Sequence, residues 1–129
     1  MRNRLIDAVE KPQIKENMPN FVVGDTVDVH CKIIEGEKTR TQIFAGTVLS
    51  LSGKGLTQMF TVRRIVLNEG VERVFPVHSP NVEKVVVKRG GQVRRAKLNY
   101  LRKRVGKSTR LADLKKKVVV EGSTETAAT

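Results

Sequence analysis

The chain has 129 residues, a formal net charge of +12 and one cysteine, which indicates a single small domain with extensions and excludes an internal disulfide. It has no Trp, one Tyr and four Phe, so any core must be built mainly on Val, Ile and Leu. No apolar run approaches the roughly 18 residues of a membrane span and no signal-peptide pattern is present, so we expect a cytoplasmic protein with no membrane partner.

Positive charge is concentrated in residues 84–117. This stretch holds fourteen of the twenty-five basic residues and a single acid, whereas residues 1–83 carry eleven bases and ten acids. Like charge at this density is unfavourable in the isolated protein, and a polyanion relieves it by releasing its condensed counterions on binding. The stretch is rich in arginine and carries apolar residues among its charges, which favours a nucleic-acid-binding arm over a solvated tail that only aids solubility.

Residues 1–20 are expected to form a short helix and an irregular lead-in. Leu5, Ile6 and Val9 recur at helical spacing, and Pro12 then stops or kinks the pattern.

Residues 21–89 carry the pattern of an all-β domain. Apolar residues from Val27 to Ile33 alternate with polar ones and put Cys31 on the apolar side, where a buried structural thiol is expected. Four more strands follow, at 39–51, 59–67, 71–77 and 82–89. Turns rich in glycine and other turn formers separate these runs, which indicates a small barrel or sandwich rather than βαβ units.

Two residues constrain individual strands. Gly46 lies inside the long run at 39–51, where a bulge or sharp bend is expected. Pro76 has no N–H to give to a ladder and marks 71–77 as an edge strand.

Residues 90–117 form a basic extension beyond this domain. A pair of glycines breaks the strand pattern, and Leu98 and Leu101 around Tyr100 indicate one or two helical turns. Ser108 is placed to cap a second short helix with three lysines in its last turn. The last segment, 118–129, is small and polar, and we expect it to be disordered.

No motif supports catalysis or metal binding. Gly106-Lys107-Ser108 is similar to the end of a phosphate-binding loop, but Leu101 stands where the first glycine of that loop belongs. His30 and His78 have no Cys, Asp or Glu partner at ligand spacing. We therefore expect no enzyme, no metal, no cofactor and no small-molecule substrate.

The expected chemistry is RNA binding by basic side chains. Arg63 and Arg64 point to opposite faces of a strand, so at least one must leave the core; salt bridges to Glu69 or Glu72 are the alternative to RNA contacts. Tyr100 lies among arginines and either stacks on a base or packs on its own domain. No aromatic platform is recognisable, so contacts to shape and backbone are expected. The candidate RNA-binding residues are Arg40, Lys54, Arg63, Arg64, His78, Lys88, Arg89, Arg94, Arg95, Lys97, Tyr100, Arg102, Lys103, Arg104, Lys107 and Arg110.

Five runs between Phe21 and Arg110 form a recognisable set. They are Gly24-Asp25-Thr26-Val27, Gln42-Ile43-Phe44-Ala45-Gly46, Phe60-Thr61-Val62-Arg63-Arg64, Gly70-Val71-Glu72-Arg73-Val74-Phe75-Pro76-Val77-His78-Ser79-Pro80 and Arg94-Arg95-Ala96-Lys97-Leu98-Asn99-Tyr100-Leu101-Arg102. In the same order and with similar spacing, these runs resemble the family of bacterial large-subunit ribosomal protein nineteen. The chain departs from the family pattern at Pro12, which interrupts a more regular helical start, and at Ala112 to Thr129, which extend past the usual end.

The resemblance implies an SH3-like β-barrel that is a structural constituent of the large ribosomal subunit and binds large-subunit rRNA. It also implies a place at the interface with the small subunit, contact with small-subunit rRNA and large-subunit ribosomal protein fourteen as a neighbour. Support of an intersubunit bridge and of the aminoacyl-tRNA site belongs to the same implication. The alternative is a free nucleic-acid-binding translation or transcription factor with such a barrel, and an RNA-modifying enzyme is more remote.

Overall fold

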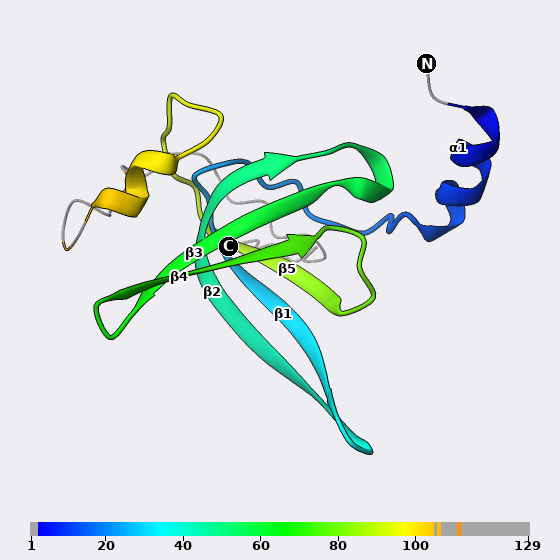
Figure 1. Ribbon diagram of the computed structural model, residues 1–129, viewed down its shortest axis with the longest axis horizontal. Helices are drawn as coiled ribbons and strands as arrows, with labels where there is room; N and C mark the ends of the chain where they lie inside the picture. Colours follow the sequence, from blue (N-terminus) through cyan, green and yellow to red (C-terminus); the bar gives the residue numbers. More distant parts are fainter. Residues whose placement is uncertain (1–2, 105, 107–110, 112–129) are drawn as a thin grey trace, which may run out of the picture.

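In the computed structural model, which describes residues 3–104, 106 and 111, five strands form one antiparallel sheet in the order β4-β3-β2-β1-β5 (Figure 1). The predicted all-β domain is therefore confirmed, with a short N-terminal helix before it. The strands are β1 (Thr26–Glu35), β2 (Lys38–Ser52), β3 (Met59–Val66), β4 (Glu69–Pro76) and β5 (Val82–Arg89). The helices are α1 (Arg4–Glu10) and the short 3₁₀ helices η1 (Lys11–Gln13), η2 (Gly55–Thr57) and η3 (Asn99–Lys103).

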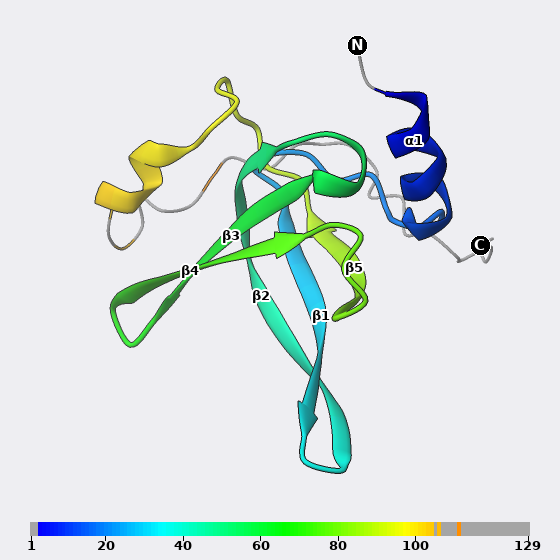
Figure 2. The ribbon, with the colours of Figure 1, turned by 45° about the vertical axis from the view of Figure 1, so that its right-hand side comes forward.

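The described strands form an open, twisted sheet whose ladder does not close into a barrel, and β4 and β5 are its edges (Figures 1 and 2). Pro76 is the last residue of β4, on the edge strand that it predicted, and its one ladder partner is Met59. Because proline has no N–H, its free side offers no donor to a further strand.

The main core covers one face of the sheet. It is dominated by valine, as the composition predicts, and Cys31 is buried in it with 6% of its surface exposed. Three phenylalanines contact one another across the core, with ring centroids 5.5 Å apart for Phe60 and Phe75 and 5.8 Å apart for Phe44 and Phe75. The buried members are Val27, Val29, Cys31, Phe44, Val48, Phe60, Val62, Phe75, Val77, Val82 and Val85.

The N-terminal helix lies away from the sheet and buries none of its residues (Figure 2). Asn3 caps it, because its side-chain oxygen accepts the N–H of Leu5 at 3.0 Å, and Pro12 then continues the chain as η1. Lys15 attaches the lead-in to the turn after β4. Its backbone N–H donates to Nδ1 of His78 at 3.1 Å, its ammonium group donates to the carbonyls of Ser79 and Val82, and burial lowers its pKa.

The β1–β2 hairpin extends beyond the sheet as a two-stranded arm. β1 pairs with β5 only as far as Cys31, and β2 pairs with β3 only from Thr47 onward. Between these limits the hairpin pairs only within itself, and its turn between Glu35 and Lys38 projects from the rest of the fold (Figure 1).

A bulge or sharp bend is expected at Gly46, and the register irregularity of β2 lies instead at Leu49. Gly46 pairs regularly with Val27, whereas the β2–β3 register shifts between Val48 and Ser50. Gly46 serves a different need, because a Cβ there would lie 2.6 Å from the carbonyl oxygen of Arg63. Glycine therefore permits a close approach of two strands at this position.

The bulge attaches the basic extension to the sheet. The Leu98 N–H donates to the Leu49 carbonyl at 2.9 Å, and Ser50 forms an isolated bridge with Lys97. Leu49, Leu98 and Leu101 are each at most 4% exposed and form a second buried cluster. The helical turns expected around Tyr100 are the 3₁₀ helix η3; the helix expected after Ser108 and the tail at 118–129 lie outside the described residues.

Candidate nucleic-acid interface

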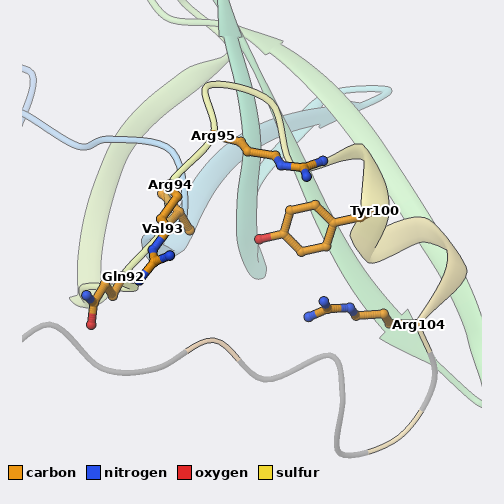
Figure 3. A pocket seen from close by; sticks show the side chains of 6 residues that line it. All are labelled: Gln92, Val93, Arg94, Arg95, Tyr100 and Arg104. Carbon is orange, nitrogen blue, oxygen red and sulfur yellow. The ribbon is translucent and has the colours of Figure 1, made fainter.

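A cavity of about 520 Å³ lies between the loop after β5 and η3, and we call it the arginine notch (Figure 3). The loop after β5 lies close to Gly24, which comes just before β1. A Cβ on Gly24 would lie 2.7 Å from a methyl group of Val93, and one on Gly91 would lie 2.2 Å from the carbonyl oxygen of Gly24. This close approach leaves room only for glycine at positions 24 and 91, and it positions the loop that leads to Arg94. The notch is lined by Gln92, Val93, Arg94, Arg95, Tyr100 and Arg104.

Tyr100 positions two of these arginines. The guanidinium carbon of Arg104 lies 4.6 Å from the ring centroid and that of Arg95 lies 5.7 Å from it, with the two groups on either side of the ring in Figure 3. The ring is half-buried and packs on the second cluster, so of the two alternatives left by the sequence, packing on its own domain is observed. A base would have to displace an arginine to stack here, whereas a phosphate can be bound by the guanidinium groups as they stand.

Glu72 fixes η3 to the sheet. Its Oε1 accepts from Nε of Arg102 at 2.8 Å and from Nη1 of Arg63 at 2.9 Å. The hydrogen bond from Arg102 is the largest influence holding the pKa of Glu72 below its usual range; burial opposes this shift, and Arg63 adds to it. The same bond raises the pKa of Arg102. Arg63 thus takes the salt bridge to Glu72 that the sequence offered as an alternative to RNA contact.

The remaining candidates are spread over the molecule. Arg40 pairs with Glu35 near the tip of the β1–β2 hairpin at 3.0 Å, and Lys88 pairs with Asp28 at 3.4 Å. His78 accepts the hydrogen bond from Lys15, so one of its ring nitrogens serves the fold. Lys54, Arg89 and Lys103 lie exposed before η2, at the end of β5 and at the end of η3, and Lys97 lies in the bridge to the bulge; Lys107 and Arg110 lie outside the described residues.

Three side chains that the structure places beside the candidates are absent from the candidate list, although the sequence also allowed Arg73 to extend the positive surface onto the domain. Gln92 and Val93 line the notch, and neither carries a charge that would single it out. Arg73 lies over the rings of Phe44 and Phe75, near Arg64. The signal for Arg73 was the two-residue turn after β3, which pairs Arg73 with Val62 and so puts it on the face that Arg64 shares.

Within residues 3–104, 106 and 111 there is no group of three or more His, Cys, Asp or Glu side chains arranged to hold a metal ion. In the same part of the chain, none of the helices is long and apolar enough to cross a membrane.

The chain is similar to known proteins over most of its length. The family model described as "Ribosomal protein L19" matches residues 4–114. The "Large ribosomal subunit protein bL19" of Rhodopirellula baltica is 62% identical over 113 residues, which cover 88% of this chain and 97% of that protein.

Proposed function

The chain belongs to the ribosomal protein L19 family and is a structural constituent of the bacterial large ribosomal subunit, and from this premise we propose that the arginine notch binds backbone phosphates of large-subunit rRNA. Members of this family are not enzymes and work in the ribosome, in the cytoplasm. Family membership also sets aside the alternatives of a free factor and of an RNA-modifying enzyme.

The observation that carries the proposal is the paired guanidinium groups over Tyr100. A planar guanidinium presents parallel N–H donors that match phosphate oxygens, and each charge-assisted bond is worth about 1.5–3 kcal/mol. Arg95 and Arg104 lie against the ring, and Arg94 lines the same cavity. Groups held in place before binding lose less side-chain entropy when they bind, which favours defined phosphates over a diffuse polycation.

We extend the proposal to the wider assembly on the basis of the family. The chain is proposed to lie at the interface with the small subunit, contact small-subunit rRNA, and neighbour large-subunit ribosomal protein fourteen. Support of an intersubunit bridge and of the aminoacyl-tRNA site is part of the same proposal. The strand order β4-β3-β2-β1-β5 supports a partly open SH3-like barrel over residues 21–89, preceded by the segment 1–20 and followed by an RNA-binding extension over 90–117 and a tail over 118–129.

The test is filter binding of the full chain to large-subunit rRNA at several salt concentrations. About 6–10 phosphate contacts predict a slope of log affinity against log salt of roughly −4 to −9. The double variant Arg95→Lys and Arg104→Lys keeps the charge but loses the planar forks, so we expect about tenfold weaker binding or worse with little change in slope. Arg4→Lys, on the distant helix α1, makes the same exchange and should bind as the unmodified chain does.

Two results would contradict the proposal. Equal binding by the double variant and the unmodified chain would mean that these arginines act only as charge. A wild-type slope shallower than about −2 would mean that phosphate contacts do not dominate the binding at all.

A further inference from the structure

A second pair of arginines lies on the sheet, on the core-side face of the β3–β4 hairpin. Arg73 pairs with Val62 in the ladder, and Arg64 is two residues along β3 from Val62, so both arginines share the face that carries the buried Val62. The guanidinium carbon of Arg64 lies 5.0 Å from the ring centroid of Phe44, and that of Arg73 lies 5.8 Å from the same centroid. Arg73 is also 4.9 Å from the centroid of Phe75.

Neither arginine has an acidic partner among residues 3–104, 106 and 111, in contrast with the adjacent Arg63, which pairs with Glu72 on the opposite face. The Nε of Arg64 is moreover buried and has no hydrogen-bond acceptor among the described residues. A buried donor without a partner loses its hydration without compensation, and buried polar groups in folded proteins are nearly always satisfied.

The charge of Arg73 also reaches the core beneath it. Burial raises the pKa of the Cys31 thiol, and the positive charge of Arg73 opposes that rise. Aromatic faces attract each guanidinium, but they neutralise neither charge. Two cations over one ring repel each other until an anion lies between them.

We propose that Arg64 and Arg73 form a second phosphate-binding site, in which one backbone phosphate of the rRNA bridges the two guanidinium groups over Phe44. The inference rests on the proposed function, because it takes its ligand from the same RNA. Phosphate is the anion that fits, because its oxygens can accept hydrogen bonds from two guanidinium groups at once. Its negative charge also complements a chain with a net charge of +12.

The two sites lie on opposite faces of the β3–β4 hairpin. Arg63 and Glu72 lie on the face away from Arg64 and Arg73, and there Glu72 holds Arg102 of η3, the helix whose Tyr100 lines the notch. The sheet site therefore brings RNA contact to a second face of the molecule, in a part of the chain where bases and acids nearly balance in number.

The test uses the full chain, large-subunit rRNA and the double variant Arg64→Gln and Arg73→Gln. Loss of one shared phosphate contact should make the salt slope shallower by roughly 0.7–0.9 and weaken binding about tenfold. The control is Arg4→Gln with Lys11→Gln, which removes the same two charges from exposed positions near the N-terminus and should leave the slope unchanged.

A further variant, Arg64→Lys with Arg73→Lys, covers the case in which the glutamine variant does not fold. It keeps both cations over the rings but loses the forks, so we expect weaker binding with an unchanged slope. Binding equal to that of the unmodified chain by whichever of these sheet variants melts cooperatively would overturn the inference. If the sheet variants bind normally but the Arg95→Lys and Arg104→Lys variant binds RNA more weakly in the same assay, the sheet site fails and the proposed function stands. If no variant binds more weakly, the proposed function fails as well.

Discussion

Glu72 is a carboxylate shared by two arginines from different parts of the chain. Arg63 reaches it from the neighbouring strand and Arg102 from η3, so this one side chain joins the basic extension to the sheet. Its side chain is 25% exposed, while that of Arg102 is 51% exposed, so solvent weakens the second ion pair more than the first.

The pKa of Glu72 predicts how stability depends on pH. Because the folded protein holds this pKa below the usual value of about 4.3, the stabilisation is fully present above that value and is lost as pH falls through the lowered one. Glu72→Gln should lower the free energy of unfolding by about 1 kcal/mol near pH 7, and the difference from the unmodified chain should shrink below about pH 4.

Urea unfolding between pH 3 and pH 7 measures this difference. Glu69→Gln is the matched control, because Glu69 is an exposed residue of the same strand and forms no ion pair with the described residues. If both substitutions gave the same pH profile, Glu72 would have no special role in holding the extension.

At the scale of elements, the turn between β3 and β4 contains a residue in an unfavourable conformation. Val66 pairs with Glu69, which leaves a loop of Leu67 and Asn68 with φ of 52° and 65°. Both central residues of this kind of turn need positive φ, a region that asparagine enters readily and leucine does not. Leu67 is 92% exposed, so burial of its side chain does not offset the free-energy cost of this backbone conformation.

Leu67→Asn should therefore stabilise the protein, by about 0.5–1 kcal/mol. Thermal unfolding measures the gain. Leu67→Ala removes the same exposed apolar surface but keeps a Cβ without a local hydrogen-bonding group, so it should give little change. A gain of equal size from alanine would show that exposure of the leucine, and not its backbone conformation, is the cost.

The strands were predictable because alternation of apolar and polar residues is a local property of the sequence. The place of the bulge was not, because Leu49 leaves the ladder to meet Leu98, a partner that no local pattern reveals. The candidate site also has a part that the sequence predicts and a part that depends on tertiary packing. Charge alone pointed to Arg95 and Arg104, but their placement on either side of Tyr100 depends on the packing of η3.

At the scale of the whole molecule, the first part of the basic extension, residues 90–104, packs on the sheet as part of the folded structure. The strand pattern alone placed residues 90–117 beyond the all-β domain. Leu98 and Leu101 are instead buried against Leu49, whose side chain they cover. Burial of leucine at this level contributes roughly 1.5–3 kcal/mol per side chain, which is a large share of the stability of a small domain.

Leu98→Ala should accordingly lower the free energy of unfolding by about 2–5 kcal/mol. Chemical denaturation in low salt, without RNA, measures this loss. Asn99→Ala changes the adjacent exposed residue and should have an effect within about 0.5 kcal/mol. If Leu98→Ala changed the free energy of unfolding only slightly, the extension would not contribute to the stability of the sheet domain.

The bulge at Leu49 also sets an order of events as the chain folds. The Leu49 carbonyl accepts the Leu98 N–H. It becomes accessible only once β2 and β3 have paired, because the register shift between Val48 and Ser50 belongs to that ladder. The β2–β3 hairpin closes a short loop, while docking of Leu98 closes a much longer one and pays more entropy. During synthesis the sheet also leaves the ribosome before the extension does. We therefore expect η3 to dock last, at a time when the arginines next to it in the chain can already meet RNA, so that docking and the first phosphate contacts coincide.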